Sequence, residues 1–60
     1  NYYAIGENIA SGQKSAAEVM NAWMNSPGHR ANILSTQFTG IAVGVVQYQG
    51  VNYWVQIFIG

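Results

Sequence analysis

The segment from Val51 to Ile59, which reads VNYWVQIFI, is the strongest constraint on how this 60-residue chain can fold. Its residues alternate as in a β-strand. One set of alternate positions is entirely apolar, and the other still carries Trp54 and Phe58. Strands that are apolar on both faces are usually covered on both sides. One or two helices cannot easily cover both faces, so we expect part of this surface to be buried against something outside the chain.

A second strand is predicted just upstream. Ile41, Val43 and Val45 alternate with smaller residues. Gln49-Gly50 then supplies a turn between the two strands. The pattern predicts an antiparallel β-hairpin, which is marginally stable in water when it stands alone.

Helical signals precede the hairpin. Ser15 and Glu18 match a capping box, and apolar residues then recur at helical spacing through Trp23 and Met24. A second, shorter helix is expected to follow and to end at Leu34. Residues 1–12 show no clean period and are expected to form a loop. The predicted fold class is therefore α+β, with one main helix and a short helix followed by the antiparallel hairpin.

The junction between the helices is set by Ser26 and Pro27. A residue before proline is pushed out of the helical region, which ends the first helix. Ser26 as the N-cap, with Pro27 at the first helical position, is a common way to start the second helix.

Charge is almost absent from the chain. Glu7, Lys14, Glu18 and Arg30 are the whole set and sum to zero. Nucleic acids and anionic membranes attract clusters of Lys and Arg, so neither is an expected partner. No apolar run approaches the roughly 20 residues of a transmembrane helix, and no signal-peptide pattern is visible. Without cysteine, neither a disulfide nor a structural zinc cluster is expected.

Glu7 and His29 are the residue types needed for acid–base chemistry or for half of a metal site. Two plainer roles compete with this one: Glu7 accepting backbone amides in a turn, and His29 packing at the helix junction. Spacing alone favours the plainer roles. Ser26 with His29 is not expected to act as nucleophile and base, because no orienting acid or nucleophile elbow accompanies the pair.

The remaining polar and aromatic residues are expected to have structural roles. Asn8 and Asn32 are expected to bond the backbone, and Arg30 is expected to pair locally. Four aromatic residues are expected in the core rather than in a ligand-stacking surface: Trp23, Tyr53, Trp54 and Phe58.

The order of motifs resembles the bacterial branch of the CAP superfamily, also called the SCP domain. The name comes from cysteine-rich secretory proteins, antigen 5 and pathogenesis-related proteins. The resemblance is carried by Gly-Glu-Asn-Ile-Ala at 6–10, by the run from Trp23 to Leu34, by Phe38-Thr39, and by Tyr-Trp-Val-Gln at 53–56. The motif residues interpreted as structural are Gly6, Asn8, Trp23, Ser26, Pro27 and Asn32.

The resemblance implies an α-β-α sandwich around a three-stranded antiparallel sheet. It also implies a cavity lined by two histidines and two acids, which in some members binds a divalent cation. Glu7 and His29 match one acid and one histidine of that cavity, and the resemblance implies that they are metal ligands. No catalytic residue is assigned.

Several departures from the family pattern indicate a partial domain over residues 1–60. The other histidine, the first long helix and one strand are expected N-terminal to this chain. Ser26 stands where many eukaryotic members have the second acid, and Ala42 stands where glycine is usual. Ile57 and Ile59 replace an acid and a glycine.

Three functions follow as hypotheses. The first is a secreted or surface-displayed binding module of uncertain ligand, placed outside the cell by the resemblance. The alternative is a hydrolase that uses Glu7 and His29. The third is an incomplete fold that forms homo-oligomers or pairs with the missing N-terminal part, because exposed apolar strand edges are templates for another chain.

Overall fold

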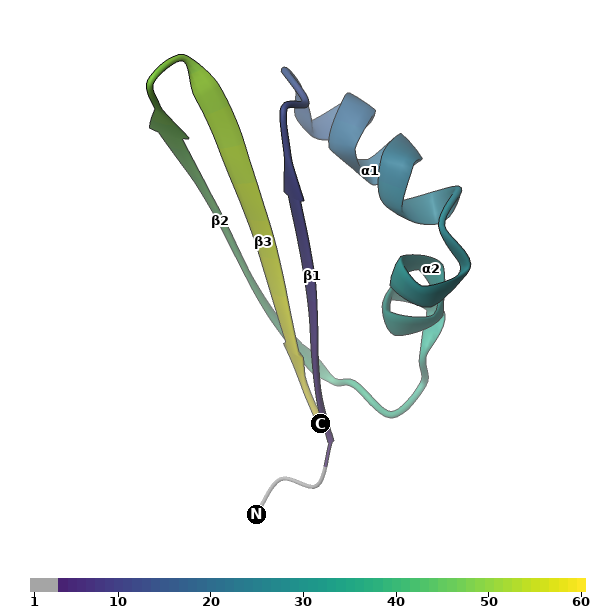
Figure 1. Ribbon diagram of the computed structural model, residues 1–60. Coiled ribbons are helices and arrows are strands. Elements are labelled where there is room, and N and C mark those ends of the chain that lie inside the picture. The colour runs from purple at the N-terminus through teal and green to yellow at the C-terminus, as the bar shows by residue number, and fades with distance from the viewer. Residues whose placement is uncertain (1–3) are drawn as a thin grey trace.

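The computed structural model describes residues 4–60 and contains two helices and three strands (Figure 1). In chain order these are β1 (Ile5–Ser11), α1 (Ala16–Met24), α2 (Pro27–Leu34), β2 (Gly40–Tyr48) and β3 (Val51–Ile59). The fold class is α+β, and both helices and the hairpin lie where the sequence predicts them. Neither helix has the length or the apolar character to cross a membrane.

The prediction of a loop over residues 1–12 is wrong for Ile5–Ser11, which forms β1. Residues 1–3 of the expected loop lie outside the described residues. Glycine and asparagine at positions 6 and 8 have low strand propensity, and they masked the strand in the sequence. Pairing with β3 overrides that local preference.

The three strands form one antiparallel sheet in the order β1-β3-β2. β3 is central, with Ile5 opposite Ile59 on one side and Tyr48 opposite Val51 on the other. The three-stranded sheet that the resemblance implies is thus formed within this chain, although one strand was expected from outside it.

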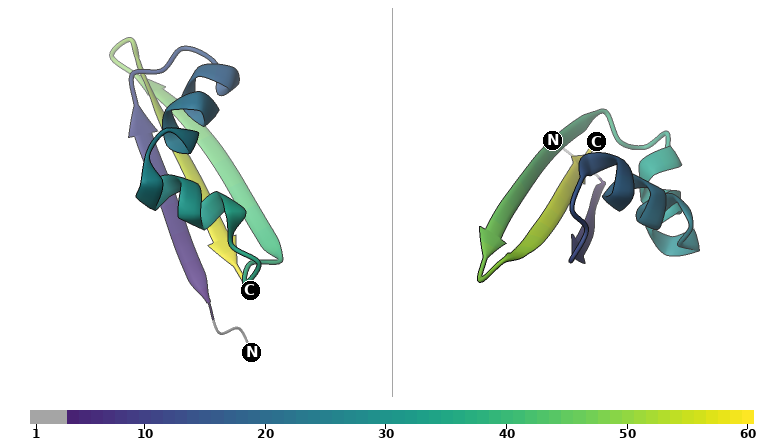
Figure 2. Two further views of the ribbon diagram at one scale, coloured as in Figure 1. Left: turned by 90° about the vertical axis from the view of Figure 1, so that its right-hand side faces the viewer. Right: turned by 90° about the horizontal axis from the view of Figure 1, so that it is seen from above.

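Both helices lie over the same side of the sheet, above β1 and β3 (Figure 2). We call this side the covered face and the other side the open face. Directly opposed residues of neighbouring strands share a face, which assigns every strand position. The covered face carries Gly6, Asn8, Ala10, Ile41, Val43, Val45, Gln47, Asn52, Trp54, Gln56 and Phe58. The open face carries Ile5, Glu7, Ile9, Ser11, Gly40, Ala42, Gly44, Val46, Tyr48, Val51, Tyr53, Val55, Ile57 and Ile59.

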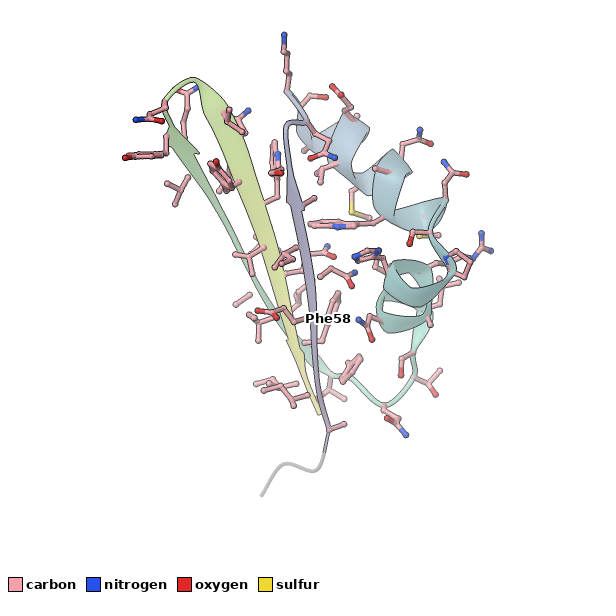
Figure 3. All side chains as sticks on the ribbon, viewed as in Figure 1. Phe58 is labelled. Atoms are coloured by element: carbon pink, nitrogen blue, oxygen red, sulfur yellow. The ribbon has the colours of Figure 1, made fainter. Side chains whose placement is uncertain are left out.

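The apolar core lies between the helices and the covered face. Its buried apolar residues are Val19 and Trp23 of α1 and Phe58 of β3. Phe58 is labelled in Figure 3, and its ring stacks on that of Phe38 with centroids 5.4 Å apart. Trp23 and Phe58 are therefore core residues, as expected.

The open face has no cover from residues 4–60. Ile5 is 66% exposed and Ile9 61%. Residues 4–60 thus leave one side of the sheet uncovered, and its burial against something outside the chain stays a prediction. The expectation of a core position for Tyr53 is wrong, because this side chain is on the open face and 47% exposed.

The start of each helix follows from its cap. The Ser15 hydroxyl accepts the Glu18 amide at 3.1 Å, as a capping box predicts. The Glu18 carboxylate accepts the amide of Lys14 at 3.2 Å, one residue before the expected partner. Ser26 is the N-cap of α2, but its hydroxyl makes no capping bond to the helix backbone.

A tight turn at Gln49 and Gly50 joins β2 to β3. Both residues have positive φ, 50° and 78° respectively, as in a type I′ turn. This turn matches the twist of antiparallel strands and prefers Asn-Gly, because asparagine tolerates positive φ better than glutamine. Gln49 is the one non-glycine residue among those described that adopts positive φ.

The substitution Gln49→Asn should therefore stabilise the protein. We expect the free energy of unfolding to rise by about 0.5–1 kcal/mol. Urea denaturation followed by tryptophan fluorescence measures the change. Gln47→Asn, in the strand two residues earlier, is the matched control and should give no gain. An equal gain from both variants would contradict the turn explanation.

Candidate functional site

Asn8 is the most deeply buried polar residue described, with 1% of its surface exposed. Its side-chain amide donates to the His29 carbonyl and to Gln56 Oε1, both at 3.1 Å. Its oxygen accepts from Asn32 Nδ2 at 3.0 Å. One side chain of β1 therefore ties the strand to α2 and to β3.

Asn32 completes this amide network from the helix. Its Nδ2 also donates to the Glu7 carbonyl at 3.1 Å. Gly6 allows the close approach, because a Cβ at this position would lie 2.8 Å from Phe38 Cζ and 3.3 Å from Asn32 Oδ1. Glycine and asparagine in the Gly-Glu-Asn motif thus have packing and hydrogen-bonding roles.

Two indole groups hold other parts of the chain. Trp23 Nε1 donates to the Ile9 carbonyl at 3.2 Å and fixes α1 beside β1. Trp54 Nε1 donates to the Gln13 carbonyl at 3.0 Å, which secures the loop that enters α1. A buried indole N–H needs such a partner, so both tryptophans fix position as well as fill space.

Gln56 is a member of the network that sequence reasoning missed. It is buried at 7% exposure, accepts from Asn8, and its Nε2 lies 3.6 Å from the sulfur of Met20. A signal was present in the sequence, because Gln56 is the one polar residue between Trp54 and Phe58 on the same strand face.

The side chain of Glu7 belongs to the open face. Glu7 is opposite Ile57, and its neighbour Asn8 points to the covered face. Alternation along a strand therefore sends the two side chains to opposite sides of the sheet. Glu7 is exposed and is the one charged side chain on a face otherwise rich in isoleucine and valine.

His29 lies in the first turn of α2 on the covered side and is half-buried. Its Nδ1 is 2.8 Å from the Ser26 hydroxyl. The Ser26 hydroxyl thus bonds the imidazole and makes no bond to the helix backbone. Within residues 4–60 no carboxylate bonds the ring, so the Ser26–His29 contact lacks the acid that a catalytic triad requires.

The structure does not bring Glu7 and His29 together. Their side chains belong to opposite faces of the sheet. No group of three or more potential metal-ligating residues occurs among residues 4–60. The shared cavity therefore stays a prediction that needs contributions from outside the described residues.

Replacing Asn8 tests the amide network directly. Asn8→Asp removes both donated bonds and places a carboxyl beside two acceptor oxygens, so we expect a loss of about 2–4 kcal/mol in the free energy of unfolding at pH 7. Burial raises the pKa of the new carboxyl above its unfolded value. The folded variant then binds the extra proton, and the loss should shrink as pH falls towards 4.

Denaturation of this variant at several pH values measures the effect. The exposed substitution Asn21→Asp on α1 is the control and should change stability by less than about 0.5 kcal/mol. A pH-independent loss at position 8 would contradict the buried-carboxyl explanation.

Two curated proteins of Bacillus subtilis (strain 168) are similar to this chain. The uncharacterized protein YkwD is 55% identical over 60 residues, which is the whole chain and 23% of YkwD. The uncharacterized membrane protein YlbC is 34% identical over 59 residues, or 98% of the chain and 16% of YlbC. The chain thus spans less than a quarter of either relative. No solved structure gives a significant match.

A family comparison agrees with these relatives and with the fold. The model of the cysteine-rich secretory protein family, CAP, matches residues 1–58. The chain contains no cysteine, so the property in the family's name is absent from these 60 residues. The match includes the Gly-Glu-Asn strand, both helices and most of the hairpin. The chain belongs to the CAP, or cysteine-rich secretory protein, family.

Proposed function

We propose that this chain is part of a secreted or surface-displayed CAP binding module that holds a divalent cation or another small cationic ligand at Glu7. One observation carries the proposal: Glu7 is the one charged side chain on the apolar open face. Its backbone carbonyl is bonded to Asn32, whereas no described residue bonds its carboxylate.

The surroundings of Glu7 select for a cation. A face this apolar is normally covered in a complete protein. A carboxylate enclosed by apolar groups is costly unless an opposite charge accompanies it. Carboxylate oxygens are also the ligands preferred by hard divalent cations. The described residues supply one such donor on this face, so further ligands would come from the segment that covers it.

The role of His29 is separable from that of Glu7. The resemblance implies that the two line one cavity, and their placement on opposite faces favours Glu7 as the direct contact. The hydrolase alternative requires both groups to touch one substrate, and no observation favours that arrangement.

A location outside the cytoplasm is part of the same proposal. The family takes its description from secretory proteins, and YlbC is named a membrane protein. Both descriptions support a place at the cell envelope or beyond it.

Calcium and zinc titrations followed by NMR test the binding proposal. We expect the Glu7 carboxylate resonance, in the protein that includes the covering segment, to respond to cation with at least ten-fold tighter apparent affinity than Glu18, because a covered apolar face excludes the water that screens the exposed Glu18. Glu7→Gln should abolish the tighter phase, and the matched variant Glu18→Gln on exposed α1 should preserve it. Equal, weak responses of both carboxylates would contradict the proposal.

The ring resonances of His29 in the same titrations distinguish a site in which Glu7 alone contacts the cation from a cavity that Glu7 and His29 share. With Glu7 as the direct contact, His29→Gln should leave the tighter phase unchanged. Loss of that phase in both Glu7→Gln and His29→Gln would instead establish the shared cavity.

A further inference from the structure

The two outer edges of the sheet differ in how their backbone groups are used. β3 is central, so successive residues of β3 bond alternately to β1 and to β2. The exchange of bonds between Ala4 and Gly60, and the bond from Gly12 to the Asn52 carbonyl, show that even-numbered residues of β3 face β1. The odd-numbered residues of β3 therefore face β2.

This alternation identifies the unpaired backbone groups of β2. Even-numbered residues of β2 are opposite odd-numbered residues of β3 and bond to them. The N–H and C=O groups of the odd-numbered residues point away from the sheet. These residues are Ile41, Val43, Val45 and Gln47. Within residues 4–60 no other strand lies along this edge.

The outer edge of β1 is protected, in contrast. Its outward carbonyls at Glu7 and Ile9 accept hydrogen bonds from Asn32 and Trp23. Side chains of both helices thus occupy the positions that another strand would need. The helices leave one sheet edge available, and that edge is β2.

β2 also lacks the features that usually prevent pairing between edges. It has no charge, no proline and no interruption of its register with β3. Val43 is 71% exposed, Ile41 59% and Val45 54%. A long apolar edge of this kind is expected to pair with another chain.

We propose that β2 pairs antiparallel with β2 of a second copy of this chain, around a two-fold axis at Gly44. This register makes Val43 opposite Val45 of the second copy and Ile41 opposite Gln47. All four outward residues of each copy are then paired, whereas a shift by two residues leaves some unpaired. The two sheets become one sheet of six strands.

The second copy is the occupant because the edge is complementary to itself. Its outward residues are distributed symmetrically about Gly44. With no charge in β2, the two-fold arrangement brings no like charges together. It also pairs β-branched valines across the strands, which stabilises a sheet. The proposal is independent of any ligand at Glu7.

Crosslinking tests the register, because the native chain contains no cysteine. Gly44 would be opposite its own copy in a pair without backbone hydrogen bonds, where Cα atoms are about 4.5 Å apart, within the range of a disulfide. A Cβ at Gly44 meets only Val55 Cγ1, at 3.4 Å. Val46 is on the same strand and face, but its two copies would lie about 13 Å apart along the strand.

We expect Gly44→Cys, incubated with oxidised glutathione at low protein concentration, to form a covalent dimer in at least ten-fold greater yield than Val46→Cys. Sedimentation of the unmodified chain should show a monomer–dimer equilibrium. Equal crosslinking of the two variants, or a monomer at all accessible concentrations, would overturn the proposal.

A second pair of variants distinguishes the edge from the open face. Val43→Pro removes an outward N–H without breaking the bonds between β2 and β3, and it should weaken dimerisation at least ten-fold. Ile9→Lys adds a charge to the open face near the other edge and should leave dimerisation unchanged. If Ile9→Lys weakens dimerisation and Val43→Pro does not, the copies associate through their open faces and the edge pairing is rejected.

Discussion

The fold depends on the buried amide of Asn8. An amide with 1% exposure is stable there only while its donors and acceptor are all paired. Its partners come from α2 and from β3, and Gln56 extends the network to Met20 of α1. Moving either helix along the sheet would break at least one of these bonds. The network therefore fixes where the helices lie, which apolar packing alone would not specify.

The positions of the helices explain the two unlike faces of the sheet. α1 has 9 residues and α2 has 8, so each is about 12–14 Å long, whereas a strand of 9 residues extends about 30 Å. The two helices in succession span one face above β1 and β3. No part of residues 4–60 remains to cover the other face. Glu7 is on that face.

Local signals in the sequence were sufficient for the helices and the hairpin. The capping box at Ser15, the proline after Ser26 and the turn at Gln49 each act within a few residues, so they predict element boundaries. β1 has no such signal. Its strand conformation comes from pairing with residues about fifty positions away, and Gly6 and Asn8 disfavour it locally.

The site was less predictable than the fold for a related reason. Sequence spacing shows that Glu7 and His29 are present, but it does not show on which face each side chain lies. That assignment requires β1 to be known as a strand and Asn8 to be known as buried. The motif resemblance predicts a cavity shared by Glu7 and His29, and the strand alternation assigns their side chains to opposite faces.

The strand order has a consequence for synthesis of the protein. β3 is the last of the five elements along the chain and the central strand of the sheet. Until residues 51–59 leave the ribosome, β1 has no partner and β2 has none either. Once β2 has been synthesised, and until β3 follows, the growing chain therefore exposes two unpaired strands, one of them apolar and uncharged, beside helices that are already complete. Pairing of β1 with β3 closes the long sequence separation from Ile5 to Ile59 and is slow, whereas β2 and β3 form a local hairpin. In the proposed dimer, the edge of β2 pairs two finished copies. The same edge is available to incorrect partners between the synthesis of β2 and that of β3, and a chaperone that shields β2 in that interval would act at the point of greatest risk.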